Sequence, residues 1–428
     1  MSRVPNPLFV GIDLGTSGCR AMAIAQDLTP IANAAVVLPV PKRDGPNCEQ
    51  DAELWWQAVL EVLTALSNRI DPGAIRAIAV AGTSGSIVLV DEQGAPVAPA
   101  LLYNDARARD EAARIAAVAP PESGAHGATS GLTKLLYLQS RPESRQARHA
   151  LNQAEWIAAR LSGRYELGDE NNCLKLGYDV IARRWPDWLD ALGVRRDWLP
   201  RVVAPGTPLG AASPAICRQF GIAPHCQVMA GTTDSIAGFL ATGAAREGEA
   251  VTSLGSTIVL KIISPQPVFA PHYGVYSHRI GKWWLAGGAS NSGGAVLRQH
   301  FTQDQLDALT PQLNPDRPTG LDYYPLPAPG ERFPIADPQL PPRLAPRPEN
   351  PVQFFQGMLE GMARIEAAGY RLLRELGAPA PLSVRTAGGG ARNDAWTRIR
   401  ARELKVPMIV PRHSEAAYGA ALLAAGRI

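Results

Sequence analysis

The sequence lacks the features that mark membrane-bound, secreted and nucleic-acid-binding proteins. It contains no run of about 18 uninterrupted apolar residues, the length that a membrane span needs. The N-terminal residues run directly into a strand pattern, without the basic and apolar regions of a signal peptide. No long Lys/Arg run occurs and the formal net charge is only +3, so neither nucleic acid nor an anionic membrane is an expected partner.

Cysteine is scarce, and two common nucleotide-binding motifs are absent. The five cysteines are scattered without any CxxC pair, which argues against a zinc site and a disulfide framework and predicts a reduced, cytoplasmic protein. Neither GxGxxG nor the Walker pattern GxxxxGK[ST] occurs. Any nucleotide must therefore be bound by other glycine-rich segments.

What is present is an α/β pattern that occurs twice. The 428 residues suit two domains, and we expect them to span 1–226 and 227–428. Each half reads as strand, glycine turn, two strands, helix, strand and glycine turn, which predicts a duplicated architecture. The expected strands are 8–14, 19–25, 32–39 and 75–81, then 250–254, 257–263, 283–286, 382–387 and 407–410. One helix is expected to begin after Asp51, and three others are expected at 351–376, 392–404 and 414–425. The last of these can belong to either domain. A proline-rich stretch, 310–350, is expected to form an ordered surface excursion.

Two glycine turns occupy equivalent positions in the two halves. They are Gly15-Thr16-Ser17-Gly18 and Gly255-Ser256-Thr257. Small residues in a hairpin turn leave backbone N–H groups that can point at phosphate oxygens. One such turn indicates no more than a plain hairpin, but two in register predict a pair of phosphate-binding loops facing one cleft.

Two aspartates and one glycine run are candidates for the remaining chemistry. Asp13 ends an apolar strand, where a carboxylate needs a partner such as water-bound Mg²⁺, or else caps the turn. Asp234 opens a helix and can accept a proton from a sugar hydroxyl, although an Asp in a first turn is common. In TAGGGARNDAW (386–396) the glycines permit a nucleotide to approach a helix N-terminus. Asn393 can then contact adenine or ribose, and Trp396 either does so or packs in the core.

These motifs together resemble the FGGY carbohydrate kinases. The segments occur in the family's order from residue 11 to 424, and they are GIDLGTSGCRA, GTTDS, SLGSTIVLK, LAGGASNSGG, YYPLPAPGERFPIADP, FFQGMLEGMAR, TAGGGARNDAW and EAAYGAALLA. The resemblance implies an α/β fold of two RNase H-like domains, as in actin, hexokinase and the heat-shock ATPases, flanking an ATP and sugar cleft. It also implies phosphorylation of a sugar or polyol with ATP and Mg²⁺.

The resemblance assigns roles to individual residues. It implies that Asp13 contacts the sugar and the metal ion and that Asp234 is the catalytic base. Both aspartates are expected to be catalytic and to bind the substrate. Ser84 lies where family members place a sugar-contacting loop. The residues expected to bind ATP are Thr16, Ser17, Gly18, Gly255, Ser256, Thr257, Gly389, Gly390, Asn393 and Trp396.

The sugar that we expect follows from the positions where this chain differs from xylulokinases of the same family. Xylulokinases typically carry a Met-His pair where this chain has Gly82-Thr83-Ser84-Gly85, and the chain is most similar to the short xylulokinase-like branch that acts on D-ribulose. We therefore expect a D-ribulose kinase, as a monomer or homodimer. The alternatives are a kinase for another pentulose or polyol such as D-xylulose, a non-catalytic sugar or nucleotide sensor, and an ATPase that acts on protein partners.

Overall fold

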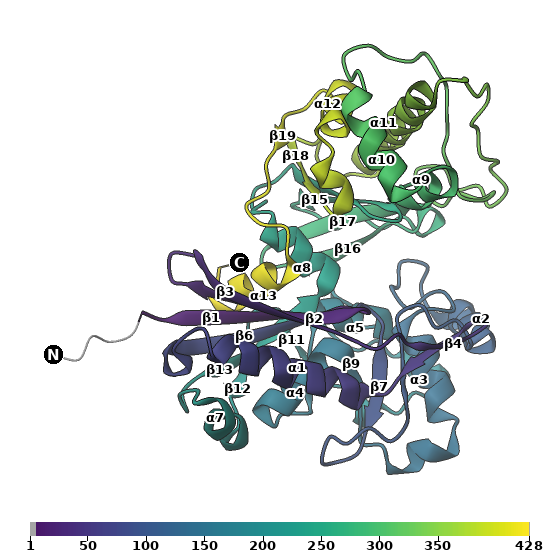
Figure 1. Ribbon diagram of the computed structural model, residues 1–428. Coiled ribbons are helices and arrows are strands. Elements are labelled where there is room, and N and C mark those ends of the chain that lie inside the picture. The colour runs from purple at the N-terminus through teal and green to yellow at the C-terminus, as the bar shows by residue number, and fades with distance from the viewer. Residues whose placement is uncertain (1–5, 428) are drawn as a thin grey trace. The chain divides into compact units, whose positions relative to one another are not determined.

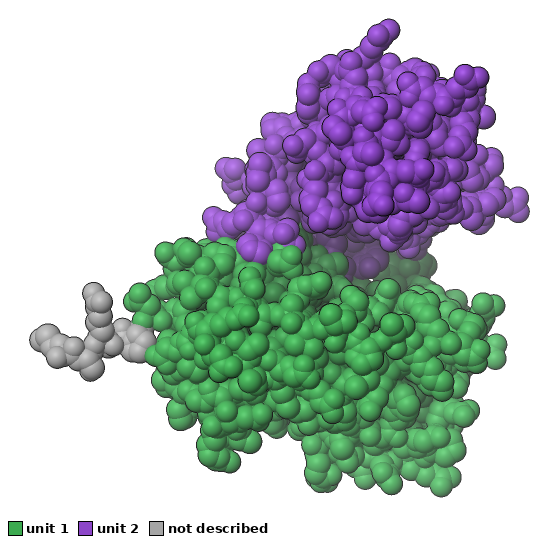
Figure 2. All heavy atoms as spheres, viewed as in Figure 1, with its two compact units in different colours: residues 1–241, 279–281, 415–428 green, residues 242–278, 282–414 purple. Residues whose placement is uncertain are grey.

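The computed structural model describes residues 6–427, and their contacts divide the chain into two compact units. Unit 1 contains the residues up to Ala241, Arg279–Gly281 and the segment from Glu415 onward, and unit 2 contains Thr242–His278 and Lys282–Ser414. Figure 2 colours unit 1 green and unit 2 purple. The division lies beyond the boundary expected near residue 226, because β13 (Gln227–Thr233) pairs with β6 (Ile75–Gly82) and extends the sheet of unit 1.

The central sheet of unit 1 has the strand order β12-β13-β6-β1-β2-β3. The remaining strands are β1 (Leu8–Leu14), β2 (Gly18–Ala25), β3 (Pro30–Val37) and β12 (Pro208–Ala211). Strand β1 pairs antiparallel with β2 and parallel with β6. It is almost wholly buried, as its apolar sequence predicts, because helices cover both faces of the sheet.

Two helices on opposite faces hold β1 in place. Helix α1 (Ala52–Ser67) begins at Asp51, whose side chain accepts a hydrogen bond from the Glu53 backbone N–H, and its apolar face joins the core under β1. Helix α13 (Ala416–Ala424) packs on the other face, against β1 and α8 (Asp234–Ala241), as Figure 1 shows. The last helix therefore belongs to unit 1, a point that the sequence left open.

Glycines permit the close approach of α13. A Cβ atom at Gly11 would lie 2.0 Å from the Ala417 carbonyl oxygen, and one at Gly419 would lie 1.8 Å from the Ala237 carbonyl oxygen. No larger residue fits at either position without moving the helix. The backbones of β1, α13 and α8 are thus in direct contact.

A second layer of unit 1 is built on a five-stranded sheet with the order β4-β5-β8-β7-β9. Helix α3 (Gly131–Gln139) packs its leucines onto this sheet within a separate apolar cluster. The strands of this sheet are β4 (Lys42–Asp44), β5 (Asn47–Gln50), β7 (Ile87–Val90), β8 (Ala100–Leu101) and β9 (His149–Asn152). The remaining helices and strands of unit 1 are β10 (Leu167–Asp169), β11 (Arg201–Val203), α2 (Arg109–Val118), α4 (Gln153–Ser162), α5 (Glu170–Cys173), α6 (Trp188–Ala191) and α7 (Pro214–Phe220).

Unit 2 repeats the core of unit 1. Its sheet has the order β16-β17-β15-β14-β18-β19, and β14 pairs antiparallel with β15 and parallel with β18, as β1 does with β2 and β6. The strands are β14 (Glu249–Leu254), β15 (Ile258–Ser264), β16 (Tyr276–Ile280), β17 (Trp283–Ser290), β18 (Ser383–Ala387) and β19 (Met408–Ile409). The helices are α9 (Gly294–His300), α10 (Gln303–Leu309), α11 (Pro351–Glu375) and α12 (Asp394–Leu404). The expected duplication is present, with α11 in the place of α1.

The proline-rich segment before α11 is more deeply packed than a surface excursion. Tyr323 and Phe333 are each 1% exposed and belong to the core of unit 2. The buried Glu331 carboxylate accepts hydrogen bonds from the Ser290 hydroxyl (2.5 Å) and the Asn291 backbone N–H (2.7 Å). These contacts fix the segment onto the end of β17.

Among residues 6–427, no helix combines the length and apolar character that crossing a membrane requires. All five cysteines are free and buried.

Candidate active site and nucleotide pocket

The parallel pairing of three strands gathers the candidate residues of unit 1 at one sheet edge. Strands β1, β6 and β13 run in the same direction, and their registers align Leu14 with Gly82 and Gly82 with Thr233. Asp13, Ser84 and Asp234 lie at or just beyond these carboxyl ends. Ligands of open α/β sheets bind at such an edge.

Asp13 is a buried carboxylate with incomplete hydrogen bonding. It is 7% exposed, its Oδ2 lies 3.8 Å from Arg20, and its buried Oδ1 has no hydrogen-bond partner among the described residues. Burial, and after it the nearby Asp234 carboxylate, raise the pKa of Asp13 to about 7, while Arg20 opposes the shift and Glu415 adds to it. The two aspartates are therefore electrostatic neighbours on unit 1.

Asp234 is the first residue of α8, directly after β13. It is half-buried, and its Oδ1 accepts a hydrogen bond of 2.6 Å from the Ser235 backbone N–H. A Cβ at the preceding Gly231 would lie 1.7 Å from the Val80 carbonyl oxygen, so β13 approaches β6 closely there. Proximity to the positive end of a helix stabilises the ionised carboxylate.

The first glycine turn joins β1 to β2. The Gly15 N–H donates to the Gly18 carbonyl oxygen (3.0 Å), with Thr16 half-buried and Ser17 exposed between them. The turn is thus a tight hairpin that lies beside Asp13. The phosphate-binding role of Thr16, Ser17 and Gly18 stays a prediction.

The loop between β6 and β7 carries Ser84. Its neighbours Thr83 and Ser86 are tied together by their hydroxyl groups (2.6 Å), and Thr83 also donates to Gln153 (2.8 Å). By contrast, the buried Ser84 Oγ has no hydrogen-bond partner among the described residues. Asn104 Oδ1 is unpartnered in the same way. No sequence pattern pointed to Asn104, but the backbone N–H of the preceding residue, Tyr103, donates to Ser86 Oγ (2.9 Å) and places Asn104 beside this loop.

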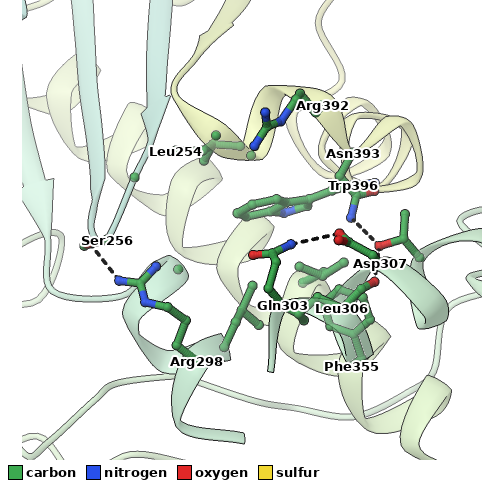
Figure 3. A pocket seen from close by; sticks show the side chains of 17 residues that line it. Leu254, Ser256, Arg298, Gln303, Leu306, Asp307, Phe355, Arg392, Asn393 and Trp396 are labelled. Atoms are coloured by element: carbon green, nitrogen blue, oxygen red, sulfur yellow. Dashed lines mark hydrogen bonds between the residues drawn. The ribbon is translucent and has the colours of Figure 1, made fainter. Parts of the chain in front are cut away.

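Unit 2 contains a cavity of about 700 Å³, which Figure 3 shows from close by. Five of the expected ATP-binding residues line its walls together with Trp396, and they are Gly255, Ser256, Gly389, Gly390 and Asn393. Thr257 belongs to the same turn, where its carbonyl oxygen accepts from the Gly255 N–H (3.1 Å), but it does not line the cavity. The second glycine turn and the 386–396 segment therefore meet around one space.

Asn393 and Trp396 are fixed by the start of α12. The Asn393 side chain accepts from the Trp396 backbone N–H (2.8 Å) and its amide lies 3.4 Å from the Thr310 hydroxyl. Trp396 both lines the cavity and belongs to the core of unit 2, at 4% exposure. The two roles predicted for Trp396 are thus compatible, since its ring lies close against Gly390 and also borders the cavity. Figure 3 shows the ring at the cavity.

Five polar residues of the cavity were not selected from the sequence, and they are Arg298, Gln303, Asp307, Thr310 and Arg392. Arg298 on α9 donates to Ser256 Oγ (2.9 Å), which places a cation beside the second glycine turn. On α10, Gln303 donates to Asp307 (2.8 Å), on the side of the cavity that faces Asn393 in Figure 3. The only available signal was helical spacing, which puts Gln303 and Asp307 on one face.

A buried ion pair supports the wall that α12 contributes. Arg400 and Glu366 are 0% and 1% exposed in their side chains and form two hydrogen bonds, of 2.6 and 2.7 Å. Thr252 donates to the same carboxylate (2.5 Å), and Thr386 accepts from Arg400 (2.6 Å). The pair therefore joins α11 and α12 to the central strands of the sheet.

Fold and site together define the class of protein. Two units with the same strand pairing, one with neighbouring carboxylates at a sheet edge and the other with a glycine-lined cavity, have the architecture of a kinase of the actin- and hexokinase-like fold.

Comparison with known proteins then assigns the family. Residues 8–241 match the N-terminal domain of the FGGY family of carbohydrate kinases, and residues 250–427 match its C-terminal domain. The chain belongs to the FGGY family of carbohydrate kinases, whose members use ATP. The family and the fold class expected from the sequence are confirmed.

The relatives act on different sugars. The chain is 28% identical over 412 residues to a xylulose kinase of Escherichia coli (strain K12), covering 92% of this chain and 84% of that protein. It is 22% identical over 451 residues to a gluconokinase of Bacillus subtilis (strain 168), covering 97% and 86%. A solved structure of a xyloylose kinase from Brucella ovis has the same fold, with a TM-score of 0.90 at 24% identity over 98% of this chain and 90% of that one.

Proposed function

We propose that the protein transfers the γ-phosphate of ATP to a ketopentose, D-ribulose, and releases D-ribulose 5-phosphate. The observation that supports this function best is the grouping of Asp13, Ser84 and Asp234 at the carboxyl ends of three parallel strands. Phosphoryl transfer to a sugar needs a base on the attacking hydroxyl and polar groups that orient the sugar, and this edge offers both.

Asp234 is the general base of the proposed reaction. Its carboxylate accepts the proton of the terminal sugar hydroxyl as that oxygen attacks the γ-phosphorus. The carboxylate lies at the N-terminus of α8, whose positive end favours a negative charge, and its half-buried position leaves it open to a substrate.

Asp13 orients the substrate and fits the predicted Mg²⁺. A buried carboxylate oxygen without a hydrogen-bond partner suits a cation bound through water. The described residues contain no cluster of three or more metal-ligating side chains, which agrees with a cation that arrives with the nucleotide phosphates. When bound, Mg²⁺ supplies positive charge that offsets the charge of the phosphates.

The cavity of unit 2 is the proposed nucleotide site. Asn393 and Trp396 border the part that takes the base and ribose, while the Gly255-Ser256-Thr257 turn and Arg298 offer donors for phosphate oxygens. We also propose, as the sequence predicts, that the protein is a cytoplasmic monomer or homodimer.

D-xylulose is the second candidate sugar, because a xylulose kinase is among the relatives. The two ketopentoses differ in the configuration at one carbon, so the side chains around the sugar must discriminate between them. This chain has Ser84 and Gly85 where the Met-His pair is expected, and the oxygens of Ser84 and Asn104, which have no hydrogen-bond partner among the described residues, offer polar contacts there. A sensor without activity is disfavoured because both aspartates are retained and are neighbours.

A coupled assay of ADP release across ketopentoses, polyols and gluconate tests the proposal. We expect the highest kcat/KM with D-ribulose, and a higher value with D-xylulose would overturn the sugar assignment. Asp234→Asn should lower kcat by a factor of about 10² to 10⁴ and leave ATP affinity unchanged. Asp110→Asn is the matched control, because it makes the same exchange in the first turn of the exposed helix α2. An Asp234→Asn enzyme as active as this control would refute the role of Asp234.

A further inference from the structure

Lys134 is a fully buried lysine that the proposed reaction does not use. It lies on α3 at 0% exposure, and its ammonium donates to the Gly85 carbonyl oxygen (2.7 Å) and the Thr129 carbonyl oxygen (2.8 Å). Both acceptors are neutral, and no ion pair within 4 Å involves Lys134 among the described residues.

The surroundings make the charge on Lys134 unfavourable. Burial lowers the pKa of Lys134 to about 7, and the nearby Lys175 ammonium lowers it too, while Asp105 and Cys48 oppose the shift. A side chain buried only for packing is more stable as an apolar residue of similar length, such as Met. The retained ammonium therefore indicates a role other than filling space.

Both lysines hold the loop that carries Ser84. Lys175 donates to the Ser84 carbonyl oxygen (3.2 Å), next to the Gly85 carbonyl that accepts from Lys134. Gly85 has φ of +86°, in the left-handed region, which turns the peptide so that its carbonyl can meet the lysine. Two consecutive carbonyl oxygens of the loop, those of Ser84 and Gly85, thus each accept a hydrogen bond from a lysine. Lys134 lies on α3, and Lys175 lies in the segment after α5.

The outcome is a loop in which one buried hydroxyl is left without a hydrogen bond. The hydroxyls of Thr83 and Ser86 are satisfied within the protein, whereas Ser84 Oγ has no hydrogen-bond partner in the part of the chain that the structure describes. We propose that Lys134 is a positioning residue, which fixes the 82–86 loop so that Ser84 Oγ is aimed at the acceptor sugar. This inference rests on the proposed function, because it assigns Lys134 to the sugar site of the kinase.

The test compares Lys134→Met with Ser84→Ala and with the double variant. Lys134→Met should raise KM for the sugar by about tenfold or more, which corresponds to losing the hydrogen bond between Ser84 and the sugar, with KM for ATP changed less than about twofold. Because Lys134 acts through Ser84, the substitution should add little to the sugar KM of Ser84→Ala. The proposal would be overturned if the increase in sugar KM of the double variant equalled the product of the increases in the two single variants. It would also be overturned if Lys134→Met raised KM for the sugar and KM for ATP by the same factor.

Two further variants separate positioning from general destabilisation. Leu136→Ala removes buried apolar atoms from the same helix, so it should lower the unfolding temperature without changing the sugar KM. Lys175→Met removes the contact to the adjacent carbonyl from a partly exposed side chain and should also raise the sugar KM selectively, which keeps the idea testable if Lys134→Met does not fold. An unchanged sugar KM in Lys175→Met would count against loop positioning. A wild-type protein without sugar-dependent ADP release would instead refute the proposed function.

Discussion

The contact between α13 and α8 permits a matched prediction with two helical glycines. Gly419 on α13 faces the Ala237 carbonyl on α8, and a Cβ there would lie 1.8 Å from that oxygen. Gly238, the next residue on α8, has no atom within 4 Å of its would-be Cβ. Replacing either glycine by alanine gives the same gain in helix propensity, so the difference between the variants isolates the close approach.

The magnitudes follow from these distances. Ordinary van der Waals contact begins at 3.4 Å and the Cβ would lie at 1.8 Å, so Gly419→Ala requires the two helices to separate by about 1.6 Å. Such overpacking costs about 3 kcal/mol, and the helix propensity of alanine returns about 1 kcal/mol. The net loss of about 2 kcal/mol should lower the unfolding temperature by about 4 to 8 °C. Gly238→Ala should instead raise the free energy of unfolding by about 0.5 to 1 kcal/mol.

Calorimetry or circular dichroism melts of the two variants and the wild type give the comparison directly. The variants should move in opposite directions from the wild type. If Gly419→Ala unfolds at the same temperature as Gly238→Ala, the helices do not approach as described, and the packing argument for unit 1 fails.

Three other perturbations have defined outcomes. Arg400→Leu leaves the Glu366 carboxylate buried without its ion-pair partner and should reduce the free energy of unfolding by about 3 to 5 kcal/mol in urea titrations. A reduction below about 1 kcal/mol would show that the Glu366 carboxylate is not held away from water in this variant. Burial lowers the pKa of Lys134 in the folded state to about 7, so between that pH and about 10 only the unfolded chain carries this proton. In that range the free energy of unfolding of the wild type, relative to Lys134→Met, should rise by about 1 kcal/mol per pH unit in urea titrations. Below about pH 6 the difference between the two proteins should not depend on pH. Removing the Arg298 cation beside Ser256 with Arg298→Ala should weaken ATP and ADP binding in calorimetric titrations but not adenosine binding, and equal losses for all three would contradict a phosphate contact.

Local patterns predicted the secondary structure where periodicity was strong. The apolar run of β1 gave the bounds 8–14 found in the structure, and Asp51 and Asn350 begin α1 and α11 as their capping chemistry predicts. The place of β13 in the sheet of unit 1 was not predicted, because it depends on pairing with β6, which is distant in sequence. The division of the chain moved to Ala241 for this reason.

The candidate site shows a similar limit. Asp13 and Asp234 were selected because each stands at the end of a strand beside small residues, and parallel pairing then brings such ends together. Neither the burial of Lys134 nor the contact of Arg298 with Ser256 has a comparable signal, since a lysine among leucines suggests an exposed position and an arginine on a helix a solvated one. Their roles depend on acceptors 49 and 42 residues away, which only the folded chain brings within reach.

The position of α13 has a consequence for how the chain is synthesised. Its Tyr418 and Leu422 complete an apolar cluster with Met22 and Ile24 of β2, yet α13 leaves the ribosome only after the whole of unit 2. During translation, the face of the first sheet that α13 covers stays exposed while unit 2, whose residues are almost continuous in sequence, is free to fold. The nascent polypeptide therefore depends on α13 to close the unit that was made first, and premature termination before Ala416 would leave that sheet open to aggregation.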